Sequence, residues 1–255
     1  MKVRAVAWNT FREAIRDKIL YNLVFFALLI MGVSTYFGEL TLGKRLKIIQ
    51  DVSLASMSIF GLLIAIFVGI GLVYKEIQRR TIYTLLAKPI SRGQFLIGKY
   101  LGLALTIILN VAVMSAVLLA LLIIYADPVV NWEVGKAVFL ILVELMLITA
   151  VAVFFSTFST PTLSAMFTLG IYIVGRFSSD LVALSSRSEN IVLKYLTMAL
   201  HYLLPNLEKF DVKGLVVHWI PVSNAYVFQS FLYGLTYIIF LLVAAVLIFR
   251  RREFK

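Results

Sequence analysis

Long apolar runs separated by short polar segments set the pattern of the chain. An α-helix rises about 1.5 Å per residue, so crossing about 30 Å of hydrocarbon takes roughly 20 apolar residues. Inside lipid every amide must be hydrogen-bonded within its own segment, which favours helix in each run. The pattern therefore predicts one all-α integral membrane domain over residues 1–255. Its six expected transmembrane helices cover residues 19–37, 53–74, 95–125, 134–158, 161–183 and 226–249.

The composition agrees with a chain that lipid surrounds. Apolar residues make up 62% of it and charged residues only 15%, whereas soluble domains hold about a quarter charged residues. The absence of cysteine excludes disulfides, thiolate metal sites and cysteine nucleophiles. Residues 1–18 are too polar for the start of a signal peptide, and the apolar run after them has spanning length, so we expect no cleavable signal.

Charge orients the expected helices. With six spans, both termini and the 75–94 loop share one side, which holds 15 of the 24 Lys and Arg. The positive-inside rule makes that side cytoplasmic, even though Lys44, Arg45 and Lys47 lie on the other. We therefore expect an N-in, C-in protein in the cytoplasmic (inner) membrane of a prokaryote. The basic excess suits anionic lipid, and no separate basic domain is present to bind nucleic acid.

Two segments differ from simple spans. Residues 1–18 are typical of an amphipathic helix in the cytoplasmic interface, either a lipid anchor or a surface shared with a cytoplasmic partner. Its apolar face is expected to contain Val3, Ala7, Phe11, Ala14 and Ile15. Residues 177–225 form a long extracytoplasmic segment before the last span. Leucines at helical spacing between residues 193 and 204 predict an amphipathic helix that caps the outer mouth.

The 75–94 loop, KEIQRRTIYTLLAKPISRGQ, is the most informative stretch. Its apolar residues fall on one short helical ridge, and Pro89 disfavours helix at Lys88. Ser91 and Gln94 then have the spacing of a capping box before the third span. The loop is thus expected to be a short cytoplasmic helix, a stiff hinge at Pro89 and a capped helix start. Such a helix either rests on lipid or docks into a groove of another protein.

The same region contains a misleading motif. Gly93, Gly98 and Lys99 have the spacing of a phosphate-binding P-loop, but Tyr100 replaces the Ser or Thr that would hold magnesium. No strand precedes the segment, so the P-loop reading is rejected. Gly98 and Gly102 instead fit a small-xxx-small contact between helices.

Motifs of catalysis are absent from the sequence. It lacks H-E-x-x-H, G-x-S-x-G and paired acids, so we expect no enzyme activity and no metal site. His201 and His218 are interpreted as surface or interface residues. Glu144 is the carboxylate placed well inside a span, where charge is costly. It either lines a polar pathway or makes a structural hydrogen bond to a neighbouring helix, and Asn110 is a weaker candidate of the same kind.

The stretch EIQRRTIYTLLAKPISR at 76–92, followed by GKYLG at 98–102, resembles the ABC-2 type transporter permeases. It is most similar to their short single-domain, NosY-like branch. Pro205-Asn206-Leu207 and Phe210-Asp211 before the last span add to the resemblance, which extends over essentially the whole chain.

The resemblance implies a permease subunit of an ATP-binding cassette transporter, expected to be an exporter. It implies a dimeric pathway, as homodimer or heterodimer, and two copies of a separate ATPase subunit that binds ATP and Mg, so that this chain needs no cofactor. Residues 76–88 would be the coupling helix that contacts the ATPase. The contact candidates are Glu76, Arg79, Arg80, Thr81, Thr84, Leu85, Leu86 and Lys88. An ion-coupled secondary transporter is the alternative, although it should show several charges in mid-membrane rather than Glu144 alone.

Overall fold

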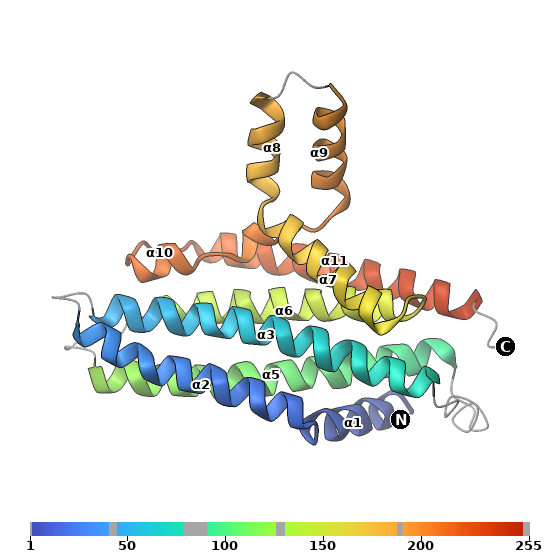
Figure 1. Ribbon diagram of the computed structural model, residues 1–255, viewed down its shortest axis with the longest axis horizontal. Coiled ribbons are helices and arrows are strands. Elements are labelled where there is room, and N and C mark those ends of the chain that lie inside the picture. The colour runs from blue at the N-terminus through green and yellow to red at the C-terminus, as the bar shows by residue number, and fades with distance from the viewer. Residues whose placement is uncertain (1, 41–44, 79–90, 126–130, 188–190, 252–255) are drawn as a thin grey trace.

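The computed structural model describes residues 2–40, 45–78, 91–125, 131–187 and 191–251, and the regular elements in those ranges are all helical. Five long helices run along the bundle, and shorter ones branch from it or lie across it (Figure 1). The elements in chain order are α1 (Lys2–Ile15), α2 (Lys18–Glu39), α3 (Arg45–Gln78), α5 (Arg92–Tyr125), α6 (Val134–Ser156), α7 (Pro161–Arg176), α8 (Ser178–Arg187), α9 (Ile191–Leu203), the 3-10 turn η1 (Leu207–Phe210), α10 (Lys213–Val217) and α11 (Asn224–Arg251).

Among the described residues, five helices are long and apolar enough to cross a membrane: α2, α3, α5, α6 and α11. They coincide with five of the six expected spans. The stretch expected at 161–183 is instead divided between α7 and α8, because α7 ends after 16 residues at Arg176. The break follows from the polar side chains there, which bond to other elements of the fold rather than continue an apolar helix.

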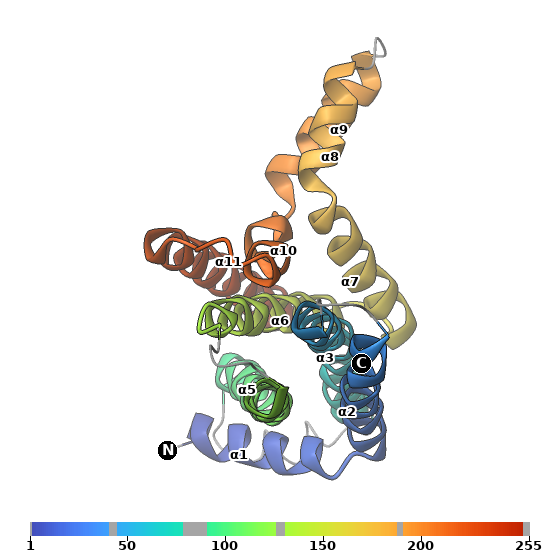
Figure 2. The same ribbon diagram turned by 90° about the vertical axis from the view of Figure 1, so that its left-hand side faces the viewer.

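Helix α6 forms the centre of the bundle, with α3, α5 and α11 packed around it (Figure 2). Its Ala, Val, Leu and Ile side chains are buried on every face, which is typical of a helix enclosed by others. Outer helices such as α2 and α11 leave many apolar side chains exposed. Exposed apolar belts of this kind suit contact with hydrocarbon.

Helix α1 crosses the bundle beside α5 (Figure 2). A Cβ on Gly98 would lie 2.7 Å from the Cβ of Val6, and one on Gly102 would lie 2.5 Å from the carbonyl oxygen of Ala7. The small-xxx-small contact expected of these two glycines is therefore present, with α1 as its partner. Lys99, buried between them, has its Nζ 3.7 Å from the carboxylate of Glu13.

The buried face of α1 differs from the expected one. Ala7 and Ala14 are buried as predicted, and the larger expected residues Val3, Phe11 and Ile15 are half-buried. Val6 and Thr10, which were not expected on this face, are buried as well. The reason is the close approach to α5, since only small side chains fit over its glycines. The helix also ends earlier than expected, because the side chain of Asp17 accepts from the amide of Ile19 and begins α2.

The start of α5 has the geometry of the expected capping box. Gln94 N donates to Ser91 Oγ at 3.2 Å, and Ser91 N donates to Gln94 Oε1 at 3.2 Å. Glu76 lies in the last turn of α3. The remaining expected coupling and hinge residues lie outside the described residues: Arg79, Arg80, Thr81, Thr84, Leu85, Leu86, Lys88 and Pro89.

The segment between α7 and α11 has two parts. Helices α8 and α9 form a hairpin that leaves the bundle between its two ends (Figures 1 and 2), so the helix expected near residues 193–204 does not cap an end. Residues 206–222 instead return along the bundle, and Leu207, Phe210 and Val216 are completely buried. The return is possible because Gly234 leaves room on α11 for the ring of Phe210.

Candidate functional site in the middle of the bundle

Glu144 lies on the central helix α6 and is only 1% exposed. Its Oε2 is 3.3 Å from Nη2 of Arg176, the last residue of α7. Its Oε1 is buried without a hydrogen-bond partner among the described residues. A charge this deep is costly unless another charge pairs with it, so the arginine is essential to the arrangement.

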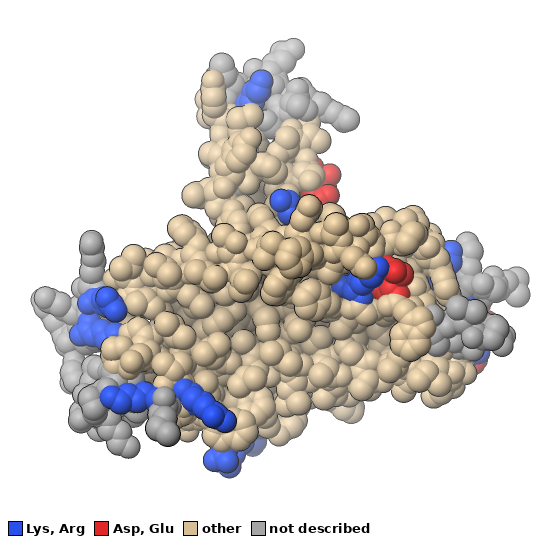
Figure 3. Space-filling model, turned by 180° about the vertical axis from the view of Figure 1, so that it is seen from behind, with Lys and Arg blue, Asp and Glu red and all other residues tan. Residues whose placement is uncertain are grey.

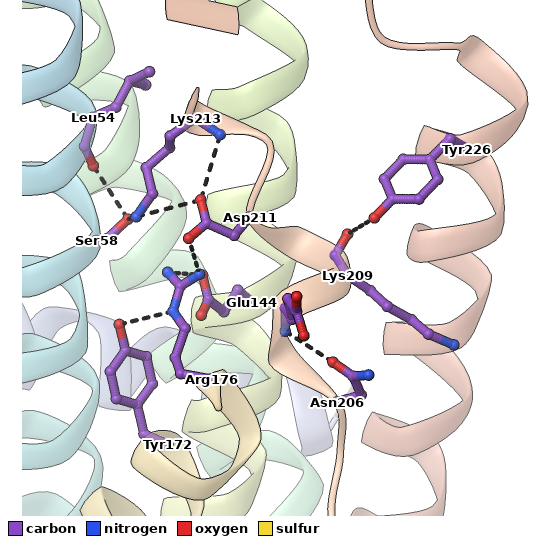
Figure 4. A network of polar contacts seen from close by, with 11 residues as sticks. Leu54, Ser58, Glu144, Tyr172, Arg176, Asn206, Lys209, Asp211, Lys213 and Tyr226 are labelled. Carbon is purple, nitrogen blue, oxygen red and sulfur yellow. Dashed lines mark hydrogen bonds and ion pairs between the residues drawn. The ribbon is translucent and has the colours of Figure 1, made fainter. Parts of the chain in front are cut away.

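Arg176 joins two acids from different parts of the chain. Its Nη1 lies 2.6 Å from Oδ2 of Asp211, which follows η1, while Nη2 faces Glu144 (Figure 4). The phenol oxygen of Tyr172, one turn earlier on α7, accepts from Nε at 3.4 Å. The guanidinium thus connects α7, α6 and the returning segment, which matches the fork of donors that arginine carries.

Lys213 extends the network to α3. Its Nζ lies 3.8 Å from Oδ1 of Asp211 and donates to Ser58 Oγ at 3.1 Å. The hydroxyl of Ser58 in turn donates to the carbonyl oxygen of Leu54. The network therefore contains two acids and two bases from α6, α7 and the segment before α11, and α3 contributes the hydroxyl of Ser58.

Helix α11 holds the turn that carries Asp211. Asn206 Oδ1 accepts from the amide of Glu208, and the amide of Asn206 donates to the hydroxyl of Tyr233 at 2.8 Å. The hydroxyl of Tyr226 donates to the carbonyl oxygen of Lys209 at 3.0 Å (Figure 4). The turn that precedes Asp211 is thus held to α11 through its backbone at Asn206 and Lys209.

The start of α6 clamps the other end of the returning segment. Glu133 Oε2 accepts from the amide of Val222 at 3.1 Å, and Lys136 Nζ donates to the carbonyl oxygen of Val222 at 2.7 Å. Asn131 Nδ2 donates to the carbonyl oxygen of Val216 at 2.8 Å. The hydrogen bond from Lys136, together with that from Val222, lowers the pKa of Glu133 below its ordinary value.

Charged side chains are sparse along the middle of the bundle surface. Figure 3 shows one face whose central area is almost entirely uncharged, with Lys and Arg gathered toward the end that carries α1. The Glu144 network is therefore a polar centre inside an apolar body. Such a centre can hold the short helix α7 and residues 206–222 in place. It also provides polar groups about halfway between the two ends of the bundle.

Part of this site can be predicted from the sequence. Glu144 was singled out, but its partner Arg176 was missed, as were Asp211, which pairs with Arg176, and Lys213, which pairs with Asp211. Two signals were available, since Arg176 ends an apolar stretch and Asp211 belongs to the motif before the last span. Asn110 lies outside the network and donates to the carbonyl oxygen of Thr106 in its own helix at 2.7 Å.

Two histidines lie in the segment that contains the hairpin and the returning turn. His201 Nδ1 is 2.8 Å from Ser178 Oγ, a contact between α9 and α8, and His218 Nδ1 is 2.8 Å from the carbonyl oxygen of Gly214. Within the described ranges, no three His, Asp or Glu side chains gather as metal ligands would. Each histidine therefore makes a contact within its own part of the fold.

Comparison with known families gives one finding. A family model with the description "ABC-2 family transporter protein" matches residues 4–254. The match includes the capped start of α5, the Glu144 network and the whole segment that returns from the hairpin to α11. A comparison with curated proteins gave no match.

Proposed function

The chain belongs to the ABC-2 family of transporter proteins, and from this we propose that it is the permease subunit of an ATP-binding cassette exporter. The observation that carries the proposal is a family match over nearly the whole chain rather than over one motif. The all-helical bundle with five candidate spans supports it, because a permease must form a path through lipid. The NosY-like branch that the sequence resembles is the branch we assign to it.

ATP hydrolysis belongs, in this proposal, to a separate ATPase subunit present in two copies. That subunit binds ATP and Mg, and this chain needs neither. Residues 76–88 seat in the ATPase as a coupling segment that continues from the last turn of α3, where Glu76 lies, with Leu85 and Leu86 in the groove. The capping box at Ser91 and Gln94 supports this role, since a firmly held helix start passes a push on the loop directly into α5.

A second permease copy, identical or homologous, completes the pathway. Two features support it. The hairpin leaves the bundle between its ends (Figure 1), and the first turn of α8 exposes the polar residues Ser179 and Asp180. Polar groups at that depth are unfavourable against lipid and need protein or a water-filled path beside them. We place that path next to α7, α8 and the Glu144 network.

The chain sits, we propose, in the inner membrane of a prokaryote with both ends in the cytoplasm. The sixth crossing is made, in this proposal, by α7 and by residues 206–222, which continue along the bundle after the hairpin (Figure 1). The basic end around α1 supports this orientation through the positive-inside rule.

The test is ATP hydrolysis by two preparations of the protein. One is purified in mild detergent from its native membranes, and the other is made in a host without the partner. The native preparation should contain an ATPase subunit and hydrolyse ATP, and the chain alone should not. ATP hydrolysis by the isolated chain, or a native preparation without any nucleotide-binding protein, would refute the proposal.

A further inference from the structure

An apolar groove of about 660 Å³ runs along one side of the bundle beside α1. Its floor is α5 from Tyr100 to Ile108, and its walls come from α6, α11 and the start of α1. The eight helical rises from Tyr100 to Ile108 correspond to a length of about 12 Å. The volume falls within the range of about 300–1,000 Å³ that is usual for small-molecule pockets. The groove is therefore large enough to hold a ligand, and it is too large to be a packing defect.

The lining of the groove is almost entirely hydrocarbon. Leu101 and Leu105 on α5 and Leu235 on α11 are partly exposed along it. The hydroxyl of Tyr100 already donates a hydrogen bond to the carbonyl oxygen of Met146 at 3.4 Å. Because the groove belongs to spanning helices, it faces the acyl chains of the bilayer. An extended apolar chain is the occupant that such walls favour.

One charge lies at the rim. Arg4 lines this groove and also a neighbouring hollow, which it shares with Trp8 and Leu105. Its side chain is exposed and makes no ion pair or hydrogen bond with any residue in the described part of the chain. Trp8 is half exposed beside it, as is common at headgroup depth. A guanidinium at the mouth of an apolar groove is complementary to a phosphate attached to an acyl chain.

We propose that this groove is a specific site for an anionic phospholipid, whose acyl chain lies along α5 and whose phosphate contacts Arg4. The inference goes beyond the transport function and does not depend on it. A second copy of the chain is disfavoured as occupant, because α1 would then face another strongly basic surface of a protein with net charge +11. A lipid brings the negative charge that the site lacks.

The test is native mass spectrometry of the purified full chain with added phosphatidylglycerol or phosphatidylcholine. The wild type should retain phosphatidylglycerol in preference to phosphatidylcholine. Arg4→Gln should weaken phosphatidylglycerol binding roughly fivefold, the effect expected of one basic residue at an anionic surface. The matched control is Arg12→Gln, which removes the same charge from an exposed position of α1 beside Trp8 and away from the groove.

A second pair of variants tests the groove itself. Leu105→Trp places a large ring in it and should reduce the retention of both lipids. Leu109→Trp, one turn further along α5 and equally exposed, lies outside the lining and should bind as the wild type does. Leu105 and Leu109 both face outward, so the two tryptophan variants should fold. They therefore test the groove even if Arg4→Gln does not fold.

Three results would overturn the proposal. They are equal losses in Arg4→Gln and Arg12→Gln, no preference between the two lipids in the wild type, or wild-type lipid retention in Leu105→Trp. A change of oligomeric state in Leu105→Trp without loss of lipid would assign the groove to a second copy instead.

Discussion

Nη2 of Arg176 lies 3.3 Å from Oε2 of Glu144, and this ion pair joins the end of α7 to the middle of α6 across 32 residues of sequence. It explains how a helix of 16 residues keeps its place beside much longer ones. The same guanidinium holds Asp211, so one side chain fixes both α7 and the segment that returns to α11.

Removing one partner of this pair should destabilise the protein strongly. Arg176→Ala leaves Glu144 charged, buried and unpaired, which costs about 3–5 kcal/mol. The double variant Glu144→Gln with Arg176→Met should be much closer to the wild type, because no isolated charge remains. The stability of the single and the double variant is measured by thermal unfolding in detergent, followed by size-exclusion chromatography. Asp180→Asn is the control, since Asp180 is exposed. Equal losses in the single and double variants would contradict the account.

The contact between α1 and α5 should depend on two glycines. Gly102→Val places side-chain atoms against the backbone of Ala7 and should cost about 1–3 kcal/mol by overpacking. The chain lacks cysteine, so a cysteine in place of the buried Thr10 reports whether α1 is seated. Maleimide should label it readily in the Gly102→Val background and slowly in the parent. Gly170→Ala, where a Cβ meets nothing within 4 Å, should leave labelling slow. Slow labelling in Gly102→Val would refute this contact.

The clamp at Glu133 should weaken in acid. Its pKa is lowered in the folded protein, so the ionised carboxylate contributes stability above the ordinary pKa of 4.5. That contribution is lost as the pH falls through the lower folded value. Wild type should therefore unfold at a higher temperature than Glu133→Gln at neutral pH, with the difference shrinking as the pH falls below 4.5. A difference independent of pH would show that the carboxylate does not act through its charge.

The orientation of the chain is open to cysteine mapping in the natural cysteine-free background. Single cysteines at the exposed positions Lys2, Trp132 and Asp180 should differ in their access to a membrane-impermeant maleimide. Intact cells should label positions 132 and 180, and position 2 should react only after permeabilisation. Labelling of position 2 in intact cells would reverse the topology. Failure at position 180 would contradict the water-filled path proposed beside α8.

How far the sequence predicts this fold depends on the distance over which each interaction acts. Five spans, the Ser91–Gln94 cap and the Gly98–Gly102 packing face follow from spacings of a few residues. The partners of Glu144 do not, because they lie 32 residues or more away and pair only once α7, η1 and α10 have met α6.

The break at Arg176 shows the limit of a hydropathy pattern. Residues 161–183 are apolar enough to suggest a span, but the pattern does not say that Arg176 pairs with the buried Glu144 and the exposed Asp211 instead of lying in the membrane interface. The burial of Leu207 and Phe210 could not be predicted for a similar reason, since the space for the ring of Phe210 is left by Gly234 on another helix.

The central claim is that this chain is driven by an ATPase bound at the 76–88 loop. The most direct measurement is the amount of nucleotide-binding subunit that co-purifies with tagged wild type, Leu85→Asp and the conservative control Leu85→Ile from membranes that contain equal amounts of each. The account predicts co-purification with wild type and Leu85→Ile, and its loss with Leu85→Asp, because a charge cannot enter an apolar groove without a partner. Undiminished ATPase binding by correctly inserted Leu85→Asp would contradict the coupling role, and an absence of ATPase from the wild-type complex would contradict the function.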